Sequence, residues 1–299
     1  MGPIAKRLIK AVRKAAKQKV VDLEAYRVGK QEAEHLEDKV RALEQVPGTD
    51  PAFAYFAYCQ NRLSNFVELV TELPEMSRFA DAIEQADDTY QPLGPPMSPL
   101  TNSYFSSWAY YDLVVGSKKE SLASCLIELG RVMKLHPNLL QAWQALERSR
   151  LGFYCCERAE GDIATLRELV TGQKHRCLVG SGYEGTPGEI WLVRLMETPD
   201  FLFEGYVTTI MPYVHIKGSG ARWNKSCEQD WQPFMTRNLG PDPEKRIEKY
   251  ASLMRFGRNR HYWNEYIFEA FVNHSSDMIY LAGFPDIEES RPHSRANWD

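Results

Sequence analysis

The stretch KHRCLVGSGYEGTPGEIWLVRLM, residues 174–196, decides the fold of this chain. Before its central loop, two basic residues alternate with His175 and Cys177, and alternation between two faces is typical of a β-strand. The loop at 180–188 is rich in glycine and contains a proline, which favours a turn. The run after the loop is apolar on both faces, as in a strand enclosed by a barrel or covered by a helix. The stretch therefore predicts two strands joined by a glycine-rich turn.

The same alternation extends outward and predicts a compact β-rich unit over residues 150–217. Its candidate strands are 150–157, 163–169, 174–179, 189–196, 201–209 and 212–217. Short strands joined by tight turns are typical of a small barrel or a strongly bent sheet.

Helical spacing on both sides of this unit predicts a composite chain of the α+β class. We expect a helical N-terminal region, a small antiparallel β-barrel-like domain, and C-terminal helices packing on it. The predicted parts are 1–91, with a basic first helix; 100–149, helical hairpins; 150–217, the β-rich domain; 225–284, a C-terminal helical segment; and 285–299, a mobile tail.

Two helix starts can be placed from their capping residues. Either Thr49 or Asp50 can be the N-cap of a helix that has Pro51 at its first position. The sequence SKKE at 117–120 has the spelling of a capping box, so a helix is predicted to begin there.

The composition is that of an ordinary globular protein. With 299 residues, 43% hydrophobic and 25% charged, the chain can build about two domains around a sizeable core. No apolar run reaches the roughly 18 residues that a membrane span needs, and no apolar segment of a secretory signal follows the basic N-terminus. Six cysteines without a CxxC pair are too sparse for a disulfide scaffold. We therefore expect reduced thiols and a cytoplasmic location.

The glycines at 180, 182 and 185 match the G-x-G-x-x-G spelling of dinucleotide-binding folds. That mechanism needs a helix directly after the glycines, so that its first amides can hold the pyrophosphate. Here Pro187-Gly188 and a β-patterned run follow. We therefore interpret the glycines as a hairpin loop and expect no cofactor.

Two pairs of residues carry metal-ligating side chains at suggestive spacing. His175 and Cys177 would share one face of a strand, with further cysteines on the neighbouring strand. His261 and Glu265 lie four residues apart in a predicted helix, which would place them on one side of it. Neither pair belongs to a complete ligand motif, so the sequence predicts no metal site and leaves these four residues as the candidates.

The segment RFGRNRHYW, residues 255–263, interleaves arginines with aromatic residues at a glycine. Arginine neutralises phosphates and aromatic rings stack on bases, but Arg, Tyr and Trp also dominate the hot spots of protein interfaces. A third interpretation is a turn between helices with its aromatic rings in the core. The residues that would make contact are Arg255, Arg258, Arg260, His261, Tyr262 and Trp263.

The first 20 residues hold seven basic side chains and no acidic one. Apolar residues recur at three- and four-residue spacing, which predicts an amphipathic helix. Three interpretations are open: a docked helix with a solvated charged face, an arm for nucleic acid or a protein partner, and a helix lying on a membrane surface. The basic residues of its polar face are Lys6, Lys10, Arg13 and Lys17.

No nucleophile, base and orienting residue can be assembled from motifs in this sequence. The sequence therefore favours a non-enzymatic binding or adaptor protein that holds a protein partner with its aromatic–basic surface. One alternative is a nucleic-acid-associated factor that binds phosphates through its two basic segments. Another is an enzyme whose acids and histidines come together from distant positions.

Overall fold

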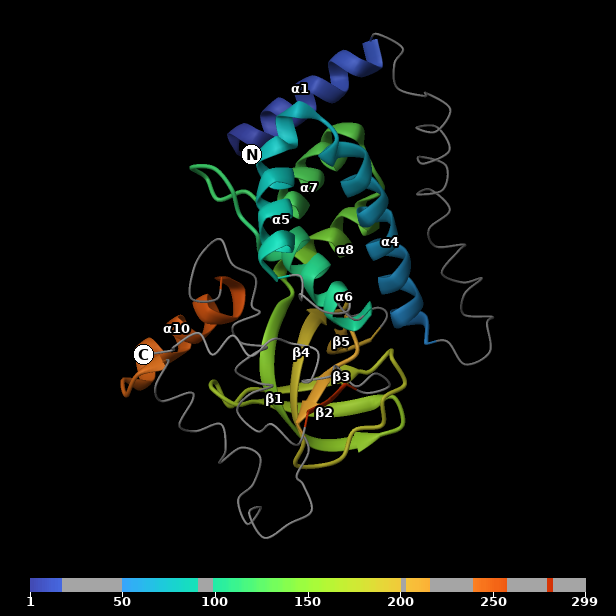
Figure 1. Cartoon of the computed structure of the whole chain (residues 1–299). Coiled ribbons are helices and arrows are strands. Elements are labelled where there is room, and N and C mark those ends of the chain that lie inside the picture. The colour runs from blue at the N-terminus through green and yellow to red at the C-terminus, as the bar shows by residue number, and fades with distance from the viewer. Residues whose placement is uncertain (18–49, 91–98, 200–202, 216–238, 257–278, 282–299) are drawn as a thin grey trace. The chain divides into compact units, whose positions relative to one another are not determined.

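The structure is a computed structural model, and it describes residues 1–17, 50–90, 99–199, 203–215, 239–256 and 279–281 (Figure 1). The chain divides into two compact units, which are described separately below. The helical unit comprises Met1–Glu84, Ala109–Ser149 and Met196–Val207. The barrel unit comprises Gln85–Trp108, Arg150–Leu195 and Thr208–Asp299.

The elements confirm the mixed α+β class. The helices are α1 (Pro3–Lys17), α4 (Pro51–Thr71), the 3₁₀ turn η1 (Pro74–Met76), α5 (Ser77–Tyr90), α6 (Pro99–Ser107), the π-helical turn η2 (Trp108–Asp112), α7 (Leu122–Met133), α8 (Pro137–Arg148) and α10 (Pro243–Phe256). The strands are β1 (Arg150–Glu160), β2 (Ile163–Glu168), β3 (Lys174–Leu178), β4 (Ile190–Glu197), β5 (Tyr206–Thr208), β6 (Tyr213–His215) and β7 (Ile279–Leu281).

The core of the helical unit is built around Trp143 of α8, which is fully buried. Its indole N–H donates to the carbonyl of Cys59 on α4 at 3.0 Å, and the ring of Phe66 meets its face edge-on at 5.5 Å. A buried Trp usually needs a partner for its N–H, and here the backbone of α4 supplies one. This contact therefore fixes the packing of α8 against α4.

The start of α4 is as predicted, whereas the start of α7 is not. The side chain of Asp50 accepts a hydrogen bond from the Ala52 amide at 2.8 Å, and Pro51 is the first helical residue. Residues 117–120 do not cap a helix. They belong to a turn closed by a bridge between Val115 and Glu120, and α7 begins at Leu122 after a capping box made by two serines, Ser121 and Ser124.

The carboxylate of Glu120 caps α1 instead of α7. One oxygen accepts from the Ile4 amide at 3.0 Å and the other accepts from the Ala5 amide at 2.9 Å. These amides belong to the first turn, where no helical carbonyl can accept from them, and a negative charge there also complements the helix dipole. Glu120 is only 7% exposed. A Cβ on Gly2 would lie 2.1 Å from its carboxyl carbon, so the packing requires glycine at position 2.

Five strands form a small closed barrel, as the alternation predicts. Around the barrel the strand order is β1, β2, β3, β5 and β4, and a further pairing between β1 and β4 closes it. Strand β6 extends the sheet from β4, and β7 follows it antiparallel.

Strand β1 closes the barrel because it is long enough to pair on both sides. Residues Arg150–Cys155 pair with β4 and residues Tyr154–Glu160 pair with β2, both antiparallel. The register with β2 shifts between Cys156 and Arg158, which makes Glu157 the extra residue of a β-bulge. A bulge bends its strand and increases its twist, as closure requires.

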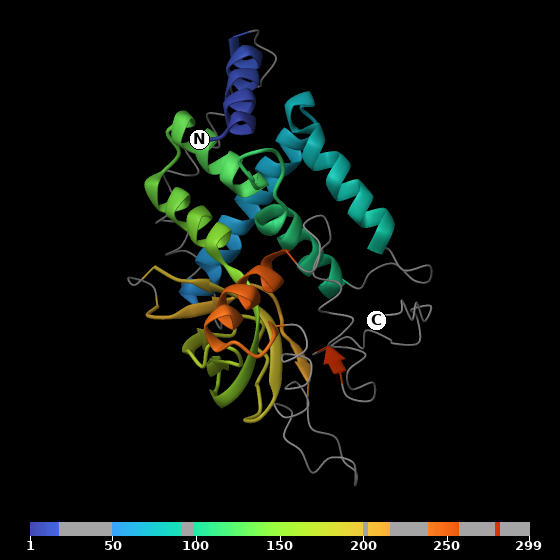
Figure 2. The same cartoon turned by 90° about the vertical axis from the view of Figure 1, so that its left-hand side faces the viewer.

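Helix α10, which is orange in Figure 2, packs on β1. The hydroxyl of the buried Tyr250 accepts from the Phe153 amide at 2.8 Å and donates to the carboxylate of Glu168. One side chain thus connects the helix to two strands. The predicted helix that would carry His261 and Glu265 lies outside the described residues.

Within the described ranges, no helix is both long and apolar enough to cross a lipid bilayer.

Replacement of Glu120 by alanine should destabilise the docked α1. The variant leaves the buried Ile4 and Ala5 amides without their acceptor, so we expect the free energy of unfolding to fall by about 2–3 kcal/mol. Urea unfolding measures the change, and hydrogen exchange should show faster exchange at these two amides. Glu128→Gln is the control. Among the described residues, Glu128 forms an ion pair only with the exposed Arg131 on its own helix, so this change should cost under about 0.5 kcal/mol. An equal effect of both variants would contradict the role of Glu120.

Candidate binding surfaces

The basic face of α1 is exposed to solvent. Its exposed cations are Lys6, Arg7, Lys10, Arg13 and Lys14. Across the described part of the chain, no ion pair joins any of these five to an acidic residue. Lys17 is the last residue of α1, and the structure does not describe its side chain.

The opposite, apolar face of α1 is buried in the helical unit. Ile4, Ala5, Leu8 and Ile9 are buried, and the helix packs on α7 and η1. An interfacial membrane helix must insert such a face among lipids. In the docked position, α1 therefore exposes only its charged face, and its apolar face is not available to insert into a membrane.

Most of the aromatic–basic segment lies outside the described residues. Arg255 is half-buried near the end of α10. The remaining predicted contact residues, Arg258, Arg260, His261, Tyr262 and Trp263, and the metal candidate Glu265 fall in the part that is not described.

His175 and Cys177 contribute to the packing of the barrel. The imidazole of His175 meets the ring of Tyr154 edge-on, with centroids 5.7 Å apart, and burial lowers the pKa of His175 below its ordinary value. Cys177 is fully buried, and burial raises the pKa of its thiol. Among the residues that can be placed, no three His, Cys, Asp or Glu side chains come together as a metal site would require.

Burial also makes the other interior thiols weak nucleophiles. It raises the pKa of Cys59, Cys125 and Cys156 to about 12. Since the thiolate is the reactive form, these side chains stay protonated and inert near neutral pH.

The glycine-rich loop is a crossover between two strands of the barrel. It joins β3 to β4, which are not neighbours in the barrel, so the prediction of a hairpin is wrong. Because β5 lies between these two strands, the chain must cross the end of the barrel to reach its pairing with β1. The loop is followed directly by the strand Ile190–Glu197, so the helix that dinucleotide binding requires is replaced by a strand.

The buried carboxylate of Glu189 organises this loop. Its oxygens accept from the Tyr183 hydroxyl, at 3.1 Å each, and from the Trp191 indole N–H at 3.0 Å. The backbone of Gly185 lies against the indole ring, where a Cβ would approach Cζ2 to 2.3 Å. Glu189 and its donors satisfy one another within the loop, so we assign them a structural role.

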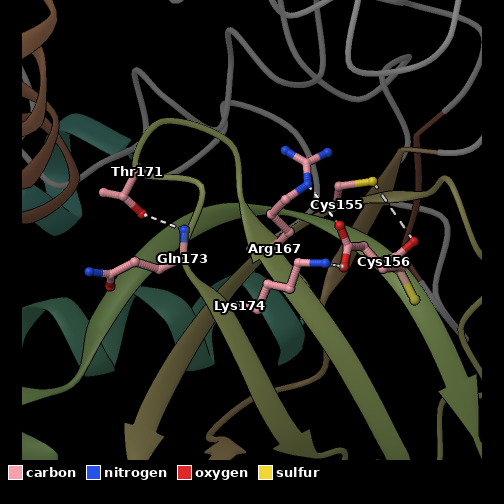
Figure 3. A network of polar contacts seen from close by, with 7 residues as sticks. Cys155, Cys156, Arg167, Thr171, Gln173 and Lys174 are labelled. Carbon is pink, nitrogen blue, oxygen red and sulfur yellow. Dashed lines mark hydrogen bonds and ion pairs between the residues drawn. The ribbon is translucent and has the colours of Figure 1, made fainter.

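A charged cluster lies on the outer face of strands β1, β2 and β3. We call it the outer-face cluster, and it consists of Glu157, Arg158, Arg167, Lys174 and Arg176. Figure 3 shows Arg167 and Lys174 projecting from their strands on the side where Cys155 lies. Glu157 accepts from Arg167 Nε at 2.9 Å and pairs with Lys174 Nζ at 2.8 Å.

Comparison of the chain with protein-family models, with curated proteins and with solved structures found no match.

Sequence reasoning missed two charged sites. The alternation of Lys174 and Arg176 predicts their shared face, but a bulge leaves no mark in the sequence, so the place of Glu157 could not be inferred. Glu120 was assigned to the wrong helix because its true partners lie more than 100 residues away.

Replacement of Gly185 by alanine should destabilise the barrel strongly. The new methyl group would collide with the buried ring of Trp191, so we expect a cost of about 2–4 kcal/mol. Gly182→Ala is the matched control. Gly182 has a positive φ of 69° but open space around it, so this change should cost only about 1 kcal/mol. Urea unfolding compares the two, and equal costs would refute packing as the reason for Gly185.

Acidification should destabilise the chain through His175. Its folded-state pKa lies below the unfolded one, so its contribution to stability is complete above the unfolded pKa and is lost as the pH falls through the folded pKa. We expect the free energy of unfolding to decline as the pH is lowered from 7.5 to 5.0. The decline should be smaller in His175→Phe, which keeps a ring beside Tyr154. Identical pH profiles of the two proteins would contradict this role.

Proposed function

We propose that this chain is a non-enzymatic nucleic-acid-binding protein that contacts phosphates through the basic face of α1. The single observation that carries the proposal is a row of exposed cations on a helix that is fixed in place by Glu120 and by its buried apolar face. Because the helix is ordered before binding, its cations are positioned without a further entropic cost of folding.

The spacing of the cations suits a linear polyanion. From Lys6 to Lys14 the helix axis advances by about 12 Å, a length over which duplex DNA carries about seven charges. Lys6, Lys10 and Arg13 follow one another at four- and three-residue spacing, so they project from one side of the helix. A phosphate backbone can meet several of them at once.

The composition of this face favours phosphates over a protein hot spot. Lysine and arginine are its only polar residues between Ile4 and Lys14, and it presents no aromatic ring. Protein hot spots are centred on Trp, Tyr and Arg in desolvated pockets. The same face carries no Asn or Gln that would pair with adenine, so we expect little sequence preference.

A protein partner is the second candidate, and α10 supports it. This helix is anchored to the barrel by Tyr250, and its Ile247 is 51% exposed, unusual for a large apolar side chain. It also leads into the aromatic–basic segment at Arg255. A cytoplasmic location suits either candidate, because the described cysteines are all free thiols.

Fluorescence anisotropy with labelled 20-nucleotide probes, single-stranded and double-stranded, tests the first proposal. Replacing all five exposed α1 cations by glutamine should weaken binding at least about 30-fold in low salt. For the unaltered chain, log affinity on the duplex should fall against log salt with a slope of about −3 to −4.

A matched variant removes the same number of cations elsewhere in the helical unit. It carries R78Q, K118Q, K119Q, R131Q and K134Q, and it should bind within about threefold of the unaltered chain. Equal losses in both variants, or a flat salt dependence, would refute α1 as the contact surface. Stronger binding to polyglutamate than to either probe would shift the assignment to an acidic protein.

A further inference from the structure

The barrel places two cations directly opposite each other on neighbouring strands. Arg167 of β2 is paired with Lys174 of β3, and side chains on one face at paired positions have Cβ atoms about 4.5–5.5 Å apart. Like charges in this arrangement repel and destabilise a sheet. A fold that keeps such a pair needs a negative charge beside it.

The β-bulge supplies that charge from within the chain. Glu157 is the extra residue of β1, and its two oxygens engage Arg167 Nε at 2.9 Å and Lys174 Nζ at 2.8 Å. The hydrogen bonds from Lys174 and Arg167 lower the pKa of Glu157, so it stays ionised well below neutral pH. A single carboxylate thus bridges two cations in the way that an oxyanion ligand would.

A second row of cations borders the first. Because of the bulge, Arg158 is paired with Thr165 of β2, which is in turn paired with Arg176 of β3. Arg158 forms an ion pair with Glu160, and its side chain remains 69% exposed. The face as a whole carries four cations and two carboxylates, and Lys174 is 63% exposed, so an anion in solvent can reach it.

We propose that the outer-face cluster is a binding site for phosphate-type oxyanions, and that Glu157 is its built-in occupant. A ligand with two or more negative charges would take the place of the carboxylate between Arg167 and Lys174, with Arg158 and Arg176 at its flanks. Arginine and lysine together provide a fork of donors and a point charge for phosphate oxygens. Glu157 therefore sets the affinity of the site by competing with the ligand.

This site is independent of the proposed role of α1, since it lies in the barrel unit and involves none of the α1 cations. The experiment below therefore uses the whole chain with Lys6, Lys10 and Arg13 changed to glutamine as the common background. Loss of nucleic-acid binding through α1 and loss of oxyanion binding on the barrel are then separate results.

Isothermal titration with inorganic pyrophosphate tests the site. Glu157→Gln keeps the shape of the side chain and removes its charge, so we expect pyrophosphate to bind about five- to tenfold more tightly than in the background chain. Glu248→Gln is the matched control, because it removes an equal charge from an exposed position on α10, in the same unit but outside the cluster, and it should change the affinity less than about twofold. Adding Arg167→Gln or Lys174→Gln to the Glu157→Gln chain should abolish the gain.

A gain of equal size in Glu157→Gln and Glu248→Gln would overturn the proposal, because the change in net charge would then explain it. An unchanged affinity in Glu157→Gln, with a thermal melt showing that the variant is folded, would overturn it as well. A parallel titration with ADP distinguishes the source of the phosphate. Equal affinity for ADP and pyrophosphate supports a site for the phosphate group alone, and tighter ADP binding supports a nucleotide site.

Discussion

The barrel depends on one strand that is shared between two partners. Strand β1 pairs with β4 through its first half and with β2 through its second half, so the sheet closes without a free edge at β1. The bulge at Glu157 and the anchor at Phe153 both fall on this strand. Closure, helix docking and the outer-face cluster are therefore consequences of the same eleven residues.

Buried carboxylates organise both units, and each does so through donors that local structure leaves unsatisfied. Glu120 accepts from the first-turn amides of α1, and Glu189 accepts from the hydroxyl and indole groups of the crossover loop. A buried carboxylate is costly unless such donors surround it. The partners of Glu120 could not be predicted from the sequence, and the sequence analysis assigned no role to Glu189.

Most of the fold could be predicted from the sequence, because hydrophobic periodicity and the residues that cap helices or form turns are local features. Alternation located the strands of the barrel, Asp50 and Pro51 located the start of α4, and the amphipathic pattern located α1. The pairing of β1 with β4, the bulge and the partner of Glu120 depend on residues far apart in the chain, so no local pattern reports them. The glycine-rich loop shows the same limit: its turn was predicted, but its hairpin pairing was not, since strand order is a tertiary property. The basic face of α1 was predicted as a candidate site, whereas the outer-face cluster required the register of three strands.

The hydrogen bonds between Glu120 and the first turn of α1 couple ligand binding to folding. A helix of 15 residues is marginally stable in water by itself, so the cations of α1 are ordered only while Glu120 and the buried apolar face hold the helix in place. A ligand that binds the ordered cations of α1 must also favour the docked helix, so binding stabilises the folded helical unit. A synthetic peptide of the same 15 residues would carry all the charge and little of the preorganisation.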